Sequence, residues 1–432
     1  MQRYGAMTQA SHQRVVRFWA SFGPGLLWAA AAIGVSHLVQ STRAGATAGL
    51  GLAGVIVLAL VLKYPFFEYG PRYAAATGMS LVEGYRHIGR WALWLYFLIT
   101  VTTSVIVQTA IILFTSFLLN YVFGLSLPIP LMGALLLIGC GGMLWVGRFP
   151  LLDGAVKVIL VLLALSTVAA AVVTLGRVDA GTLALWPSDA LATGAVRFAF
   201  ILALVGWMPS AIDISVWSSL WTLAKDKAAG ARASVAAARL DFFIGYAGTG
   251  FLAFCFLILG AGVMFGSGTA FSGAGPVFST QLVHLYSTTL GEWTRPIVLV
   301  AVLTTMLSTS ITVVDGFPRA LERSFVNLKP GHSDEHGVPS AGVPYWVTLV
   351  ALAASTVLVL VLFVGNLTTM VDFATIVSFL TAPVLGYLNL RVVNSPEVAP
   401  EHRPGRAMLV LSWVGLLLLG GTAVVYVGML IG

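Results

Sequence analysis

Long apolar segments follow one another along the whole chain, and short polar segments separate them. Each is long enough to cross the hydrocarbon core of a bilayer, which takes about 20 helical residues. The pattern therefore predicts about eleven membrane-spanning helices and no sizeable soluble domain. They are expected near residues 19–46, 50–76, 92–123, 127–147, 150–175, 195–224, 241–266, 294–321, 344–365, 367–392 and 406–431.

The number of basic residues alternates between high and low from one loop to the next. Most of the 23 Lys and Arg residues lie in the N-terminal segment or after every second predicted helix, whereas Arg177, Arg197 and Arg295 lie on the other side. Cytoplasmic loops carry the excess of Lys and Arg. The N-terminus is therefore expected inside and the C-terminus outside, in a bacterial cytoplasmic (inner) membrane.

The composition excludes other classes of protein. Hydrophobic residues make up 58% of the 432 residues and charged residues 9%, whereas soluble domains carry about 25% charge. The net charge of +7 follows the alternating loops, so it indicates topology and not a nucleic-acid surface. Cys140 and Cys255 lie in apolar segments, where we expect small buried hydrophobes and neither a disulfide framework nor a cysteine-rich metal site.

Two polar segments also have an expected role. Residues 1–18 are polar and basic and lack the apolar core of a signal peptide, so they are expected to form a cytoplasmic N-terminal segment. The loop 267–293 has apolar residues at helical spacing, which predicts a short helical cap on the outer face.

The first and sixth predicted helices contain residues that interrupt a helix. The first reaches Gly34-Val35-Ser36-His37 near mid-membrane, and the sixth reaches Gly206-Trp207-Met208-Pro209-Ser210 at similar depth. Proline lacks a backbone donor and glycine allows unusual dihedrals, so Gly34, Gly206 and Pro209 are the predicted hinges. Such breaks are tolerated in a membrane only where they line a cavity or are covered by protein.

The second break follows the first by five helices, so the second set of helices runs opposite to the first. This predicts an inverted repeat, with residues 19–175 as the first repeat (helices 1–5), residues 195–392 as the second (helices 6–10), and residues 406–431 as helix 11. Secondary transporters built in this way bind substrate at the midplane between the unwound segments. The alternative is a pair of kinks that serve packing alone.

Three motifs occur in order along the chain: Gly23-Pro24-Gly25, Ala44-Gly45-Ala46 and Gly206-Trp207-Met208-Pro209. In these motifs, and in helix order and spacing over most of its length, the chain resembles the NRAMP family of divalent metal ion transporters. The resemblance implies an all-α LeuT-type 5+5 inverted repeat plus one extra helix. It also implies a secondary transporter without cofactors that moves a divalent metal ion of the Mn²⁺ or Mg²⁺ type by alternating access.

The chain departs from that family where metal and protons would bind. Gly34-Val35-Ser36-His37 stands in place of Asp-Pro-Gly-Asn, and Ser210 and Ser215 stand in place of two histidines. Family members carry a carboxylate in helix three and an arginine in helix nine for proton passage, but residues 92–123 lack Asp and Glu and residues 344–365 lack Arg. A divergent member without the usual proton route is therefore expected.

A metal site is predicted at the two breaks, with His37, Met208 and Asp213 as ligands. Thioether and imidazole ligands favour softer transition metals over Mg²⁺ or Ca²⁺, and Asp213 would supply negative charge. The predicted substrate-binding residues are Gly34, Ser36, His37, Gly206, Met208, Ser210 and Asp213.

A small anionic or zwitterionic solute is the alternative substrate, because broken helices turn positive N-termini towards the cavity and His37 and Arg43 add to that charge. Arg43 would otherwise pair with Asp213 or extend to the outer surface. A membrane enzyme is the third class considered, but no Walker loop, zinc-protease motif or nucleophile elbow occurs and no catalytic residue is predicted. The expected partners are membrane lipid and the solute or metal ion, and not nucleic acid.

Overall fold

The computed structural model describes residues 23–431 except 147–148, 177–184, 193, 195, 269, 330–341 and 364–365. The predicted cytoplasmic segment 1–18 therefore lies outside the described residues. Those described form helices, turns and loops but no strand. The helices are α2 (Pro24–Ala32), η1 (Ser36–Ser41), α3 (Thr42–Ala48), α4 (Ala53–Thr77), α5 (Leu81–Ile88), α6 (Arg90–Phe123), α7 (Ile129–Val146), α8 (Phe149–Leu175), α9 (Ser188–Ala192), α10 (Phe198–Gly206), α11 (Ile214–Ala229), α12 (Val235–Val263), α13 (Gly275–Leu290), η3 (Glu292–Thr294), α14 (Arg295–Leu328), α15 (Val343–Leu362), α16 (Leu367–Val393), η4 (Pro400–His402) and α17 (Arg406–Ile431).

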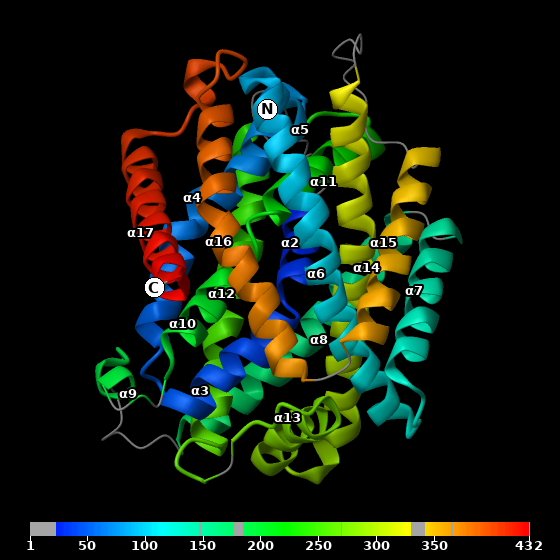
Figure 1. The fold of residues 1–432 in the computed structure, drawn as a ribbon, viewed down its shortest axis with the longest axis vertical. Helices are drawn as coiled ribbons and strands as arrows, with labels where there is room; N and C mark the ends of the chain where they lie inside the picture. Colours follow the sequence, from blue (N-terminus) through cyan, green and yellow to red (C-terminus); the bar gives the residue numbers. More distant parts are fainter. Residues whose placement is uncertain are drawn as a thin grey trace, which may run out of the picture.

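Most of these helices run roughly side by side along the molecule (Figure 1). Within the described residues, eight are long and apolar enough to cross a membrane: α4, α6, α7, α12, α14 with the preceding η3, α15, α16 and α17. Two further segments, α2 to α3 and α10 to α11, are interrupted, and α8 completes the order that the sequence predicts. The chain is thus an all-helical membrane protein, while the count of eleven spans stays a prediction.

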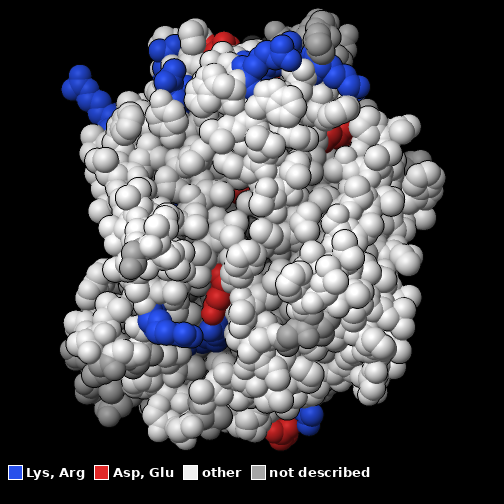
Figure 2. All heavy atoms as spheres, in the orientation of Figure 1, with Lys and Arg blue, Asp and Glu red and all other residues white. Residues whose placement is uncertain are grey.

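The two ends of the molecule differ in charge and structure. Figure 2 shows Lys and Arg gathered at the upper end in view, which we call the basic end; α5 and the start of α17 lie there (Figure 1). The opposite end carries α13, the helix predicted in the loop 267–293. We call it the α13 end.

The continuous helix α12 supports both halves of the interrupted first helix. A Cβ atom on Gly25 would lie 2.1 Å from the carbonyl oxygen of Asp241, and one on Gly45 would lie 2.0 Å from that of Leu257. Real Cβ atoms do not approach so closely, so only glycine allows α2 and α3 to contact α12 in this way. The crossings keep the two halves in line on either side of the break.

The interrupted sixth helix is held by different neighbours. A Cβ atom on Gly206, at the end of α10, would lie 2.0 Å from the carbonyl oxygen of Thr375 in α16. On the other side of the break, the backbone of α4 contacts that of α11 at Gly70. A Cβ atom on Gly70 would lie 2.2 Å from the carbonyl oxygen of Ser215 in α11, so only glycine allows this contact. These contacts place the two breaks in the interior of the molecule.

Candidate functional site

The first helix is interrupted at the predicted place. Helix α2 ends at Ala32, Ile33 has an extended backbone (φ −81°, ψ 96°), and the chain resumes in the π-helical turn η1. The carbonyl groups freed there have partners: the Ser36 hydroxyl donates to the Ala32 carbonyl (2.5 Å), and the Thr309 hydroxyl of α14 donates to the Ile33 carbonyl (3.1 Å). Side chains therefore replace the missing helical hydrogen bonds, as burial requires.

The sixth helix is interrupted between Gly206 and Ile214, around a cis Met208–Pro209 peptide bond. The buried Lys63 of α4 satisfies the freed carbonyl groups on this side. Its Nζ donates to the carbonyl oxygens of Val205 (2.9 Å), Gly206 (2.9 Å) and Ser210 (2.6 Å). In this conformation, the side chains of Ser36, Thr309 and Lys63 therefore bind the carbonyl groups that the two breaks free.

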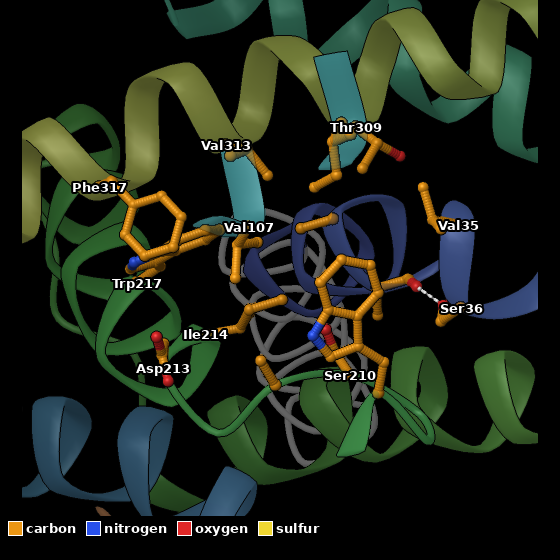
Figure 3. Close-up of a pocket in the computed structure, with 15 residues that line it drawn as sticks. Val35, Ser36, Val107, Ser210, Asp213, Ile214, Trp217, Thr309, Val313 and Phe317 are labelled. Carbon is orange, nitrogen blue, oxygen red and sulfur yellow. Dashed lines mark hydrogen bonds between the residues drawn. The ribbon is translucent and has the colours of Figure 1, made fainter. Parts of the chain in front are cut away.

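A small cavity lies between the two breaks, with walls from α2, α6, α11 and α14. Its volume of about 30 Å³ suits one or two water molecules or an ion, since one water needs roughly 10–15 Å³. Most of the wall is apolar, as Figure 3 shows for Val35, Val107 and Phe317. The hydroxyl and carboxyl groups on it belong to Ser36, Ser210, Asp213 and Thr309, and the Trp217 indole, whose Nε1 has no hydrogen-bond partner among the described residues, also lines it.

Asp213 is the carboxylate on this cavity wall, and only 1% of it is exposed. The Thr103 hydroxyl of α6 donates to Oδ2 (2.8 Å), whereas Oδ1 has no hydrogen-bond partner among the described residues. A buried carboxylate oxygen without a partner is unfavourable by about 1–3 kcal/mol or more. The position just before α11 offsets part of this, because the N-terminus of a helix attracts negative charge.

The other two predicted metal ligands point away from the cavity. The His37 ring donates from Nε2 to the Thr249 carbonyl of α12 (2.9 Å), and its Nδ1 lies 2.7 Å from the Ser36 hydroxyl. Met208 is fully buried in an apolar cluster with Ala44 and Leu257. The described residues contain no group of three or more His, Cys, Asp or Glu side chains that could hold a metal ion.

The structure thus brings together only part of the predicted set. The cavity wall contains Ser36, Ser210 and Asp213. The two breaks contain Gly34 and Gly206, which do not line the cavity. The side chains of His37 and Met208 face other helices. Their roles in binding and as hinges remain predictions.

Two residues at the site were not predicted to act there. Lys63 stood out in the sequence as a charge inside an apolar helix, but Thr103 carried no signal because hydroxyl residues are common in such segments. Arg43 does not pair with Asp213. It binds Asp372 of α16 instead (2.7 Å), since it lies in α3, on the α13 side of the break.

Solved structures with the same fold are transporters. A manganese transporter of Eremococcus coleocola, in complex with an aromatic bis-isothiourea substituted compound, superposes with a TM-score of 0.75 at 15% identity, over 95% of this chain and 86% of that one. Mhp1, a nucleobase-cation-symport-1 family transporter in a closed conformation with bromovinylhydantoin bound, gives 0.54 at 14% identity, over 95% and 92%. These similarities establish the fold.

Sequence comparison reaches further. An uncharacterised protein of Pasteurella multocida (strain Pm70) is 34% identical over 429 residues, which cover 98% of this chain and 96% of the relative. The family model for natural resistance-associated macrophage protein-like (Nramp) sequences matches residues 25–428. The chain therefore belongs to the Nramp family, whose members are membrane transporters and not enzymes.

Proposed function

We propose that this protein is a secondary transporter that carries a hard divalent cation, Mg²⁺ or Mn²⁺, across a bacterial cytoplasmic membrane. The observation that carries the proposal is the buried Asp213 carboxylate, whose Oδ1 is unpaired at the wall of a cavity between two interrupted helices. A cation bound there would gain the partner that this oxygen lacks. The basic end faces the cytoplasm in this proposal, as the positive-inside rule requires.

The ligand chemistry of the cavity favours a hard ion. Its possible metal ligands are a carboxylate and hydroxyl groups, and neither imidazole nor thioether lies on its wall. Oxygen ligands suit Mg²⁺, Ca²⁺ and Mn²⁺, whereas nitrogen and sulfur ligands suit softer metals. Mg²⁺ typically binds through one or two carboxylates and keeps several waters, which fits a site with one carboxylate better than the six to eight oxygen ligands of Ca²⁺ do.

An anionic solute is disfavoured by the same groups. The Arg43 guanidinium, which would have attracted it, is occupied by Asp372. The His37 ring faces α12, and the charge that the cavity does present is the negative one of Asp213. A larger zwitterion would also need more room than about 30 Å³.

Alternating access would use the two breaks as hinges. In this conformation the cavity has room for a dehydrated ion or one or two waters, so a hydrated ion can enter only if the helix halves move apart. Helices α2 and α10 end at residues 32 and 206. Side-chain hydrogen bonds hold both breaks, so the helix halves can move without the loss of a continuous backbone hydrogen-bond ladder.

Transport without the usual proton route is part of the proposal. The side chain of α6 that contacts Asp213 is the Thr103 hydroxyl, which does not exchange a proton near neutral pH. The neighbouring polar contact between α6 and α15 joins Gln108 to Thr356, two more groups that do not titrate.

Purified protein in liposomes tests the proposal, with dyes for Mn²⁺, Mg²⁺ and pH inside the vesicles. We expect uptake of at least one of the two ions without acidification, and a loss of at least about tenfold in Asp213→Asn, which keeps the side-chain shape but removes the charge. Asp226→Asn, near the other end of α11, is the matched control and should transport normally. Wild-type protein that moves neither ion, or full flux through Asp213→Asn, would contradict the proposal.

A further inference from the structure

The ammonium group of Lys63 is enclosed by the interrupted sixth helix. Its side chain is fully buried in α4, and its Nζ donates to three backbone carbonyl oxygens at distances of 2.6–2.9 Å. An ammonium group has three donors and no acceptor, so its hydrogen-bonding capacity is complete. Two of the three acceptors end α10, and the third lies in the break between α10 and α11.

The three carbonyl groups converge on one cation, the Lys63 ammonium. Val205 and Gly206 are the last residues of α10, so their carbonyls lie at the negative end of the helix dipole. The carbonyl of Ser210 converges on the same point from the unwound segment. In transporters with interrupted helices, carbonyls of this kind coordinate the Na⁺ or H⁺ that is coupled to the substrate.

The surroundings make the site rigid and dry. Gly206 packs against the Thr375 backbone so closely that even a Cβ atom does not fit, and the Phe67 ring lies 5.6 Å from the ammonium nitrogen. The Glu68 carboxylate, one turn further along α4 at i+5, is bound by Arg72 and Arg239. That leaves Asp213, across the break, as the acidic group whose field reaches Lys63.

We propose that Lys63 is a tethered substitute for a free monovalent cation. Its ammonium permanently occupies the site formed by the carbonyls of Val205, Gly206 and Ser210, so this protein binds no Na⁺ at the break. Lys63 is a positioning residue in this role: it keeps the unwound backbone in the shape that presents Asp213 to the cavity. The transported ion would bind at Asp213, on the other side of the same segment.

Removal of the side chain should open the site to a free ion. Lys63→Ala removes the ammonium group from the three carbonyls and leaves space for a cation, whereas Lys63→Met fills the same space with an apolar chain. Lys227→Ala removes an exposed lysine from α11, the second half of the same interrupted helix. Lys63→Ala and Lys63→Met both remove the charge at the site, but only Lys63→Ala leaves space there. Lys227→Ala removes a charge elsewhere in the protein.

The experiment measures ²²Na⁺ binding to the purified full chain, together with the unfolding temperature in NaCl, KCl and choline chloride at equal ionic strength. Wild type, Lys63→Met and Lys227→Ala should bind no Na⁺ and unfold alike in the three salts. Lys63→Ala should bind about one Na⁺ per chain and be stabilised by NaCl in a saturable way, since a ligand that binds only the native state raises its stability. These readouts need no transport, so they stand apart from the test of divalent-ion flux.

Other outcomes overturn the inference. Stoichiometric Na⁺ binding to the wild type would show that Lys63 does not fill the site, and a folded Lys63→Ala that binds no Na⁺ would show that the carbonyls do not form one. Lys63→Ser leaves the same space with an added hydroxyl ligand and serves as the second variant. If Lys63→Ala and Lys63→Ser both unfold in every salt, the site does not accept a free cation and the inference fails.

Discussion

Arg43 and Asp372 form a bidentate ion pair, with Nη1 2.7 Å from Oδ1 and Nη2 3.1 Å from Oδ2. The pair joins α3, the second half of the first helix, to α16, and Gln40 donates to the same carboxylate (3.0 Å). The Arg43 guanidinium also lies 4.8 Å from the centre of the Phe200 ring in α10. Halves of both interrupted helices thereby meet at one contact, on the side of the cavity towards the α13 end.

Arg43→Ala should make the cavity more accessible from the α13 end. Partly exposed ion pairs contribute about 0.2–1 kcal/mol, which corresponds to a shift of roughly up to fivefold in the opening equilibrium. The measurement is the rate at which an impermeant thiol reagent modifies Ser210→Cys in a background with Cys140→Ala and Cys255→Ala. Arg391→Ala, at the exposed end of α16, should leave this rate unchanged; an equal rate in Arg43→Ala would show that the pair does not hold the cavity closed.

Asp241→Ala should destabilise the start of the first helix. The Asp241 carboxylate of α12 accepts hydrogen bonds from the backbone N–H groups of Gly23 (3.1 Å) and Gly25 (2.6 Å). An unpaired buried donor costs about 1–3 kcal/mol, so we expect a loss of that order in a thermal or denaturant unfolding experiment in detergent. Asp241→Asn keeps one acceptor oxygen and should lose less; equal losses in the two variants would mean that packing, and not the carboxylate, holds Gly23 and Gly25.

Gly260→Ala should destabilise the protein through the crossing of α12 with α3. The added Cβ would lie 2.1 Å from the carbonyl oxygen of Thr42, and overpacking of this kind costs about 1–3 kcal/mol. Gly248→Ala in the same helix is the control, because a Cβ there has no heavy atom within 4 Å and alanine is the better helix former by up to about 1 kcal/mol. Unfolding measurements should therefore move in opposite directions for the two substitutions, and a shift in the same direction would argue against the tight crossing.

Thr309→Val should expose the break in the first helix. The two side chains have similar shapes, but valine cannot donate to the carbonyls of Ile33 and Ala30. The unpaired Ile33 carbonyl should lower the free energy of unfolding by about 1–3 kcal/mol. Thr304→Val is the control, because the Thr304 hydroxyl contacts only carbonyls of its own helix, those of Val300 and Ala301. Little change in the free energy of unfolding is expected there. A similarly small effect for Thr309→Val would mean that another group satisfies the Ile33 carbonyl.

The sequence alone determined the helical architecture and the places where it is interrupted. Span length and charge alternation are local properties of the chain, and the effects of Gly34, Gly206 and Pro209 on the backbone depend little on distant residues. The interruptions follow from these residues, and both occur where the sequence predicts them. Lys and Arg side chains likewise gather at one end of the molecule in the face that Figure 2 shows.

Only the tertiary structure decided which side chains face the cavity. A helical periodicity predicts facing residues while the helix is regular, but beyond Gly34 the chain enters a π-helical turn, with a different number of residues per turn. This change in winding places His37 against Thr249 of α12. The partners of Lys63 and Arg43 lie far away in sequence, so no local pattern could reveal that one satisfies the break in the sixth helix and the other binds Asp372.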